Sequence, residues 1–136
     1  MIDKLTIYTD GGARGNPGPA GIGVVIYGAG EQPIRQKGEY LGEGTNNQAE
    51  YKALILGLKE ALDLGASEVQ FFLDSELVVK QITGKYKVKE PELKILVMEA
   101  LRLCNKFARV DFKHVPREKN KLADKLVNEA LDKAGY

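Results

Sequence analysis

The sequence contains one cysteine, one histidine and no tryptophan. The single cysteine, Cys104, excludes an internal disulfide, and its apolar helical surroundings favour a buried small side chain over a nucleophile. No cluster of cysteine and histidine is present, so nothing in the sequence suggests a zinc site. Metal chemistry in this chain would have to rest on oxygen ligands.

Long hydrophobic runs are also absent. No apolar run is long enough to span a bilayer, and no charged segment followed by an apolar one opens the chain. We therefore expect a cytoplasmic protein that makes no membrane contact. A length of 136 residues fits one hydrophobic core, so we expect a single domain over residues 1–136.

The net charge is only +1, but the charges are unevenly distributed. Residues 1–84 carry 7 basic and 11 acidic side chains, whereas residues 85–125 carry 12 basic and 6 acidic ones. A basic segment beside an acidic one suits a polyanion held next to a metal site. A solvated surface of lysine and glutamate explains the same counts.

Alternating and helical patterns of apolar residues predict an α/β protein. Three strands joined by short glycine-containing turns open the chain as an antiparallel meander, and later strands are joined through helices. We expect a mixed five-stranded sheet with helices on both faces. The expected strands are residues 4–10, 22–27, 34–41, 68–74 and 109–114, and the expected helices are residues 47–64, 75–82, 92–107 and 118–134.

Four carboxylates occupy unusual positions in this pattern. Asp10 and Asp74 each end a predicted strand, at the sheet edge where α/β proteins bind ligands. Glu50 and Asp124 lie at the edges of apolar helix stripes, where an unpaired charge is costly. Each is explicable alone, and Asp10 before Gly11-Gly12 is a common turn arrangement. Together they predict an oxygen-ligand site for Mg²⁺ or Mn²⁺.

His114 is the one histidine, in a basic segment ten residues before Asp124. A lone histidine is usually structural or merely exposed. Beside a metal site, however, it could carry protons.

Four sequence blocks contain these residues: Asp10-Gly11-Gly12 with Gly15-Asn16-Pro17-Gly18-Pro19; Thr45-Asn46-Asn47-Gln48-Ala49-Glu50; Leu73-Asp74-Ser75; and His114-Val115-Pro116-Arg117-Glu118 with Asn120 and Asp124. In this order and spacing they resemble the type 1 ribonuclease H family, of the retroviral-integrase-like nuclease superfamily. The resemblance covers nearly the whole chain and implies the ribonuclease H-like fold.

The resemblance implies an endonuclease that hydrolyses the RNA strand of RNA–DNA hybrids by a two-metal mechanism, leaving 5′-phosphate and 3′-hydroxyl ends. It implies two Mg²⁺ or Mn²⁺ ions held by Asp10, Glu50, Asp74 and Asp124, with His114 as a mobile catalytic histidine. The implied substrate contacts are Gly11, Gly12, Asn16, Thr45, Asn46 and Asn47. Helix capping by Asn46 and Asn47, and turn formation by Asn16, remain alternative explanations.

The chain departs from the family pattern after the Asp74 helix. Many bacterial relatives carry a longer basic protrusion with tryptophans, whereas this chain has a short connector at residues 84–91. Lys85 and Tyr86 in this connector are candidate hybrid contacts, although Tyr86 could instead pack against the following helix. Glu76 adds an acid where relatives often have an uncharged residue.

Two other functions stay open at this point. One is a nucleic-acid-binding module of the same fold with weak activity, and the other is a resolvase-type nuclease that acts on DNA. Retention of all four carboxylates argues against the first, and the glycine–asparagine block favours RNA over DNA. We expect a monomer, because no exposed apolar stripe is evident in the sequence.

Overall fold

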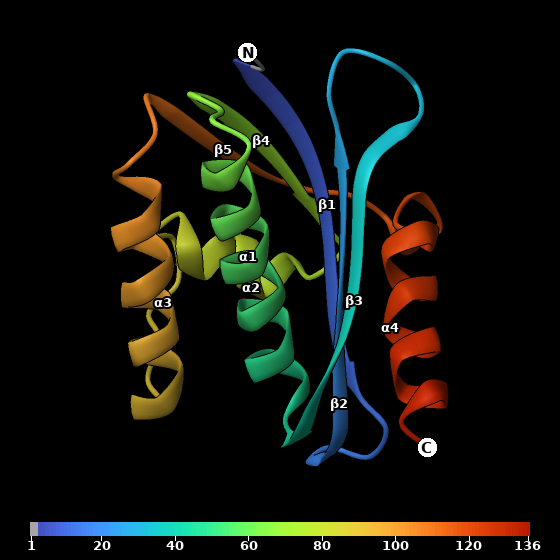
Figure 1. Ribbon diagram of the computed structural model, residues 1–136. Helices are drawn as coiled ribbons and strands as arrows, with labels where there is room; N and C mark the ends of the chain where they lie inside the picture. Colours follow the sequence, from blue (N-terminus) through green and yellow to red (C-terminus); the bar gives the residue numbers. More distant parts are fainter. Residues whose placement is uncertain (1–2) are drawn as a thin grey trace.

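The structure is a computed structural model that describes residues 3–136. A five-stranded sheet with the spatial order β3-β2-β1-β4-β5 forms its centre (Figure 1). The fold class predicted from the sequence is confirmed. The elements are β1 (Lys4–Ala13), β2 (Gly18–Tyr27), β3 (Pro33–Gly44), α1 (Asn46–Asp63), β4 (Glu68–Leu73), α2 (Glu76–Ile82), α3 (Pro91–Cys104), β5 (Arg109–His114), the 3-10 turn η1 (Arg117–Lys119) and α4 (Lys121–Lys133).

The first three strands form the antiparallel meander that the glycine turns predict. The strands β4 and β5 then pair in parallel on the other side of β1. Each parallel connection passes through helices, because two parallel strands cannot be joined by a tight turn. The strand β1 is therefore central, with an antiparallel neighbour on one side and a parallel neighbour on the other.

The predicted end of the first strand is wrong. The strand β1 continues through the glycines to Ala13, where it still pairs with Ala20 of β2. The open loop expected after Asp10 shrinks to a turn over residues 14–17. Glycine tolerates extended backbone as well as turns, so its presence alone did not distinguish the two. As a result, Asp10 lies inside a paired strand and not at its end.

Helices cover the two faces of the sheet unequally. The helices α1, α2 and α3 lie on one face, and α4 alone covers the other (Figure 1). The main core lies between the sheet and α1, where Leu5, Ile7 and Phe71 meet Leu54 and Leu58 with no exposed surface. This face supplies most of the buried apolar area and hence most of the hydrophobic stabilisation.

The helix α4 lies unusually close to the sheet at Gly23. A methyl group at that position would lie 2.3 Å from the carbonyl oxygen of Ala123. Only glycine permits this approach, which places the first turn of α4 directly over β2. That turn carries Asp124.

The last two helices differ from the sequence prediction at their ends. The final helix begins at Lys121 and not near residue 118, because a 3-10 turn precedes it and Asn120 has non-helical backbone angles. Leu101 and Ala134 are exposed, although the spacing of apolar residues places both on the apolar stripes of their helices. The helix α3 packs mainly on α1 and buries only a narrow stripe, so Ile95 and Met98 are 68% and 69% exposed. The expectation that no apolar stripe is exposed was therefore wrong.

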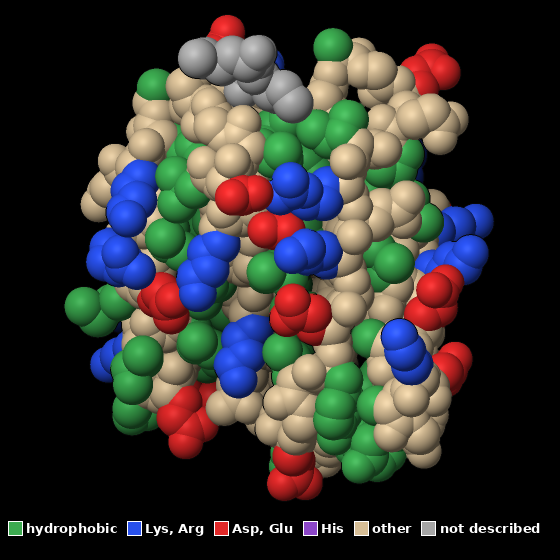
Figure 2. Space-filling view, in the orientation of Figure 1, with side chains coloured by type: hydrophobic (Ala, Val, Ile, Leu, Met, Phe, Trp, Pro, Cys, Tyr) green, Lys and Arg blue, Asp and Glu red, His purple; other side chains and the backbone are tan. Residues whose placement is uncertain are grey.

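Lysine and arginine side chains are scattered among acidic ones on the face formed by α1, α3 and β3 (Figure 2). Many of these basic groups are paired, as in Lys37 with Glu60 at 2.9 Å and Lys59 with Glu99 at 3.6 Å. This face is a mixed-charge surface and not a basic patch. Among the helices in residues 3–136, none is long and apolar enough to cross a membrane.

Candidate active site

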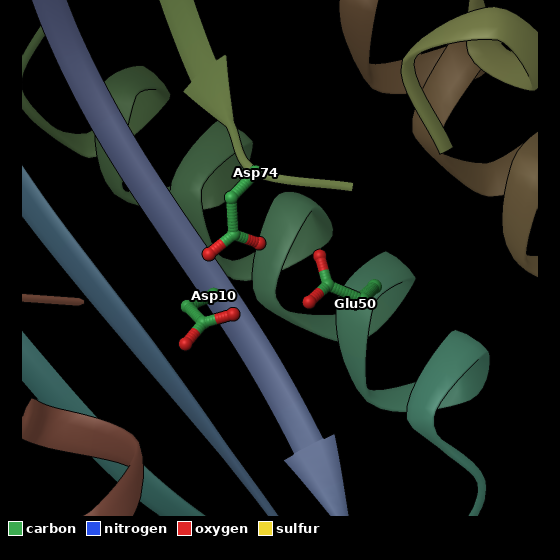
Figure 3. A group of neighbouring side chains, drawn as sticks. All are labelled: Asp10, Glu50 and Asp74. Atoms are coloured by element: carbon green, nitrogen blue, oxygen red, sulfur yellow. The ribbon is translucent and has the colours of Figure 1, made fainter. Parts of the chain in front are cut away.

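Three carboxylates from separate elements converge at one point (Figure 3). Asp10 comes from β1, Glu50 from the first part of α1, and Asp74 from the residue that follows β4. One oxygen of each lies within 4.8 Å of the others. This is the kind of spacing that a single cation can bridge.

Strand register explains why Asp10 and Asp74 are neighbours. The parallel strands β1 and β4 pair Thr9 with Leu73, so the next residue of each strand lies side by side. Both side chains alternate away from α1, because Thr9 and Leu73 are buried on the α1 face. The parallel arrangement predicted from the sequence therefore accounts for this pair.

Glu50 projects from α1 at the point where this helix lies against Gly11 of β1. The backbone N–H of Gly11 donates to Glu50 Oε1 at 3.2 Å. The helix begins at a capping box in which Thr45 and Gln48 satisfy each other's backbone groups, so the register of Glu50 on α1 is fixed from its first turn.

Burial makes the cluster electrostatically costly. Asp10 and Glu50 are 8% and 7% exposed, and Glu50 Oε2 has no hydrogen-bond partner among residues 3–136. Burial and then the charge of Asp74 raise the pKa of Asp10 to about 7. Burial and then Asp10 raise the pKa of Glu50 well above its ordinary value, and burial also raises that of Asp74. A divalent cation with a preference for hard oxygen ligands, Mg²⁺ or Mn²⁺, fits this donor set and would relieve the repulsion.

Asp124 approaches the cluster from the opposite face of the sheet. It is in the first turn of α4, and its negative charge helps to raise the pKa of Asp10. It is not among the three residues whose oxygens lie within 4.8 Å of one another. The fourth predicted carboxylate is thus adjacent to Asp10 and outside the tight group.

All four carboxylates line one hollow of about 550 Å³. The hollow also contains backbone from Gly11 and Gly12, and the side chains of Asn46 and Asn47. The sequence prediction did not assign several other polar residues there: Arg14, Ser75, Arg117 and Asn128. Arg117 could have been identified from the sequence, because it lies in the block that begins at His114.

The other predicted substrate residues mainly hold the loops around the hollow. Asn16 Oδ1 accepts from the backbone N–H of Asn46 at 3.0 Å, and Asn46 Oδ1 accepts from that of Ala13 at 2.8 Å. The side chain of Thr45 accepts from Gln48 as the helix cap. Asn16 thus bonds to the start of α1 and not within its own turn. The helix cap is Thr45, so the helix-capping alternative for Asn46 and Asn47 is wrong, and both of these residues border the hollow.

His114 lies beside the site and not within it. It is the last residue of β5, paired in register with Leu73 next to Asp74, and its side chain is 41% exposed. Its Nδ1 lies 3.9 Å from Oε2 of Glu76. An exposed imidazole at a strand end can turn toward or away from the carboxylates.

Lys85 and Tyr86 do not line the hollow. Both are exposed in the connector after α2, and their backbone N–H groups donate to the carbonyl of Lys80. The Nζ of Lys80 donates to the Tyr86 hydroxyl at 3.3 Å and lies 5.0 Å from its ring centre. Tyr86 therefore packs against the helix before it, not the helix after it as one interpretation expected.

Comparison with known proteins places this geometry in a family. The chain matches the model of the reverse transcriptase-like family over residues 8–130. It is 46% identical over 132 residues to the bifunctional protein Rv2228c of Mycobacterium tuberculosis, covering 96% of this chain and 36% of that protein. This chain therefore spans about a third of the length of that relative. The solved N-terminal RNase H domain of Rv2228c superposes with a TM-score of 0.93 at 45% identity, covering 97% of this chain and 96% of that one.

Two further solved structures are similar over nearly their full length. RNase H1 from the halophilic archaeon Halobacterium salinarum has a TM-score of 0.93 at 42% identity, covering 96% of this chain and 98% of that chain. LC11-RNase H1, solved in complex with an RNA/DNA hybrid, has a TM-score of 0.91 at 50% identity, with the same coverage of 96% and 98%. Sequence and fold agree over the same residues that carry the carboxylate cluster, and the chain belongs to the type 1 ribonuclease H family.

Proposed function

We propose that this protein is an endonuclease that hydrolyses the RNA strand of RNA–DNA hybrids with the help of divalent metal ions. The observation that carries the proposal is the group of Asp10, Glu50 and Asp74, in which Asp10 and Glu50 are buried and Glu50 Oε2 has no hydrogen-bond partner among residues 3–136. A relative at 50% identity was solved with an RNA/DNA hybrid bound, which supports the choice of substrate.

The position of each carboxylate would determine which metal ion it binds. Asp10 lies next to the Glu50 and Asp74 pair on one side and to Asp124 on the other, so it is placed to serve two ions. Two bound Mg²⁺ or Mn²⁺ ions would activate the attacking water and stabilise the leaving oxygen, leaving 5′-phosphate and 3′-hydroxyl ends. The buried protein surface around them keeps the carboxylates fixed before the substrate arrives.

Selection for RNA would come from the rim of the hollow. Gly11 and Gly12 expose backbone there, and Asn46 and Asn47 stand beside them. Backbone amides and side-chain amides can pair with a ribose 2′-hydroxyl, which deoxyribose lacks. Discrimination then follows because these polar groups would lose a hydrogen-bond partner against DNA.

His114 would assist proton transfer or product departure. Its side chain is exposed, and it pairs with Leu73, the residue before Asp74, so it lies at the edge of the site where a proton carrier is needed. It is not required for binding the ions, so its contribution is smaller than that of the carboxylates.

An assay with three labelled duplexes tests the proposal. The RNA–DNA hybrid, double-stranded DNA and double-stranded RNA are incubated with the protein in EDTA, Mg²⁺, Mn²⁺ or Ca²⁺. We expect cleavage of the hybrid alone, in Mg²⁺ or Mn²⁺, with a loss of the cut next to a single deoxy substitution in the RNA strand. Cleavage of double-stranded DNA would favour the resolvase-type nuclease, and tight hybrid binding with negligible turnover would favour the binding module.

We also propose that the protein acts as a monomer in the cytoplasm. The hollow is complete within one chain, which supports a monomeric catalyst. Light scattering measures the oligomeric state directly. Ile95 and Met98 on α3 are the exposed apolar residues to replace if a dimer is found.

A further inference from the structure

Asn120 is a buried amide at the junction of the three segments that carry Asp10, Asp74 and Asp124. It is 1% exposed and lies between η1 and α4. A buried amide must find hydrogen-bond partners, or it costs on the order of 1–3 kcal/mol. The hydrogen-bond partners of Asn120 therefore indicate its structural role.

The side chain of Asn120 turns to the sheet and not to its own helix. Asparagine before a helix usually caps the first free backbone N–H groups. Asn120 makes no side-chain cap hydrogen bond with α4. Its Nδ2 instead donates to the carbonyl oxygen of Thr9 at 2.9 Å, across 111 residues of sequence. Thr9 is the residue immediately before Asp10.

The segment that carries Asp74 adjoins this contact. Thr9 pairs with Leu73 in the parallel ladder of β1 and β4, so the residue held by Asn120 lies beside the residue that precedes Asp74.

The backbone of Asn120 holds the third segment. Its carbonyl oxygen accepts from the N–H of Asp124 at 3.1 Å, and its own N–H donates to the carbonyl of Arg117 at 2.9 Å. The residue thus closes η1 and begins the turn that carries Asp124.

We propose that Asn120 is a positioning residue that joins the segments of Asp10, Asp74 and Asp124 and thereby sets the affinity of the site for divalent metal. This rests on the proposed function, because it assumes that these carboxylates bind metal. Asn120 contacts the segments that carry ligands and no reacting atom. Removal of comparable outer partners of metal ligands lowers metal affinity or activity roughly 10–100-fold.

The test uses Asn120→Leu, which keeps the size of the side chain but removes the donor. Mn²⁺ is titrated into the metal-free protein by calorimetry at 20 °C, and circular dichroism confirms folding at that temperature. We expect the dissociation constant for Mn²⁺ to rise at least tenfold and the metal concentration for half-maximal hybrid cleavage to rise in parallel. The Michaelis constant for the hybrid should change less than the metal dependence does.

Loss of stability alone is controlled by Glu60→Ala. Glu60 is also buried and polar, but it lies near the other end of α1 from Glu50. There it pairs with Lys37 and Arg35 of β3. This variant should lower the melting temperature and leave the dissociation constant for Mn²⁺ unchanged. If Asn120→Leu does not fold, Asn120→Ser replaces it and should show the same tenfold rise.

The outcomes separate the inference from the function on which it rests. If the wild-type protein binds Mn²⁺ and cleaves hybrid, but the Asn120 variants bind Mn²⁺ with wild-type affinity, the inference is overturned and the function stands. If the wild-type protein neither binds Mn²⁺ nor cleaves hybrid, both are overturned.

Discussion

Gly11 of β1 lies directly against the backbone of Ala49 in α1. A methyl group at residue 11 would be 2.3 Å from the carbonyl carbon of Ala49, far inside contact distance. The missing side chain lets the helix approach the strand, and this approach puts Glu50 within hydrogen-bond distance of the Gly11 amide. The site between β1 and α1 therefore depends on a residue with no side chain.

Gly11→Ala should destabilise the protein and damage the site together. The added methyl group must push β1 and α1 apart, at a cost of about 1–3 kcal/mol in the free energy of unfolding. We expect hybrid cleavage to fall as Glu50 moves away from Asp10. Urea unfolding and cleavage rates measure the two effects. Gly30→Ala is the matched control, because nothing lies within 4 Å of a methyl group there. Wild-type stability for Gly11→Ala would contradict the close approach.

Asp10→Asn should abolish turnover while raising the stability of the metal-free protein at pH 8. In the proposed function Asp10 binds both ions, and replacing it removes repulsion with Asp74 and Glu50. Cleavage assays in Mg²⁺ and thermal unfolding in EDTA measure the two effects. Glu31→Gln, in the exposed turn after β2, controls for the loss of one negative charge. Near-normal cleavage by Asp10→Asn would remove this residue from the proposed metal ligands.

The pH dependence of stability provides a third test. The pKa of Asp10 is about 7 in the folded protein against 3.8 for the ordinary group, so the folded state binds the proton more tightly. Between these values the folded protein holds more protons than the unfolded chain, and its stability falls as pH rises. In EDTA, the difference in melting temperature between wild type and Asp10→Asn should therefore grow from pH 4 to pH 7 and level off above. A difference that stays constant over this range would show that the Asp10 pKa is not raised.

His114→Ala should slow cleavage without stopping it. Assistance with proton transfer contributes typically 10²–10⁴-fold, and we expect a loss of at most this size. Single-turnover rates in saturating Mg²⁺ isolate the chemical step, and Arg109→Ala at the other end of β5 is the control. A rate equal to that of the wild type would leave His114 as an ordinary exposed residue at a strand end.

The connector lysines should contribute to the binding affinity for the hybrid. Lys85, Lys87 and Lys89 are exposed in the segment between α2 and α3. Each phosphate neutralised adds roughly 0.9 to the slope of log affinity against log salt. Replacing all three with alanine should raise the Michaelis constant and flatten this slope, with turnover at saturation near that of the wild type. The control removes Lys52, Lys59 and Lys133, which are exposed on helices. If the connector variant keeps wild-type affinity at every salt concentration, the contacts lie elsewhere.

Local patterns in the sequence were enough to predict the antiparallel meander, the helical crossovers and the convergence of Asp10 with Asp74. Alternation and crossover connections determine which strands are parallel, and the parallel register of β1 and β4 places Asp10 beside Asp74 although β1 continues to Ala13. The path of the chain through Gly11 and Gly12 was not predictable, because glycine is compatible with both turn and strand. The decisive factor was the fit of α1 against β1, which is a contact between residues far apart in the sequence.

The roles of Asn120 and Leu101 were hidden for related reasons. Asn120 follows a helix-start pattern, and only the folded chain shows that its amide bonds to Thr9 and not to α4. Leu101 belongs to an apolar stripe, but α3 packs mainly on one helix, and part of the stripe stays exposed. Periodicity indicates which side chains could be buried, whereas the number of neighbouring elements decides which ones are.

The scattering of the four carboxylates along the chain means that no short fragment can hold a complete site. A break in the exposed turn at residues 28–32 would leave Asp10 on one piece and Glu50, Asp74 and Asp124 on the other. The first piece would carry β1 and β2, whose partners β3 and β4 are both on the second. Neither piece alone would carry all four carboxylates. The proposed nuclease activity would therefore be recovered only when the two pieces associate, which is the property that a split reporter requires.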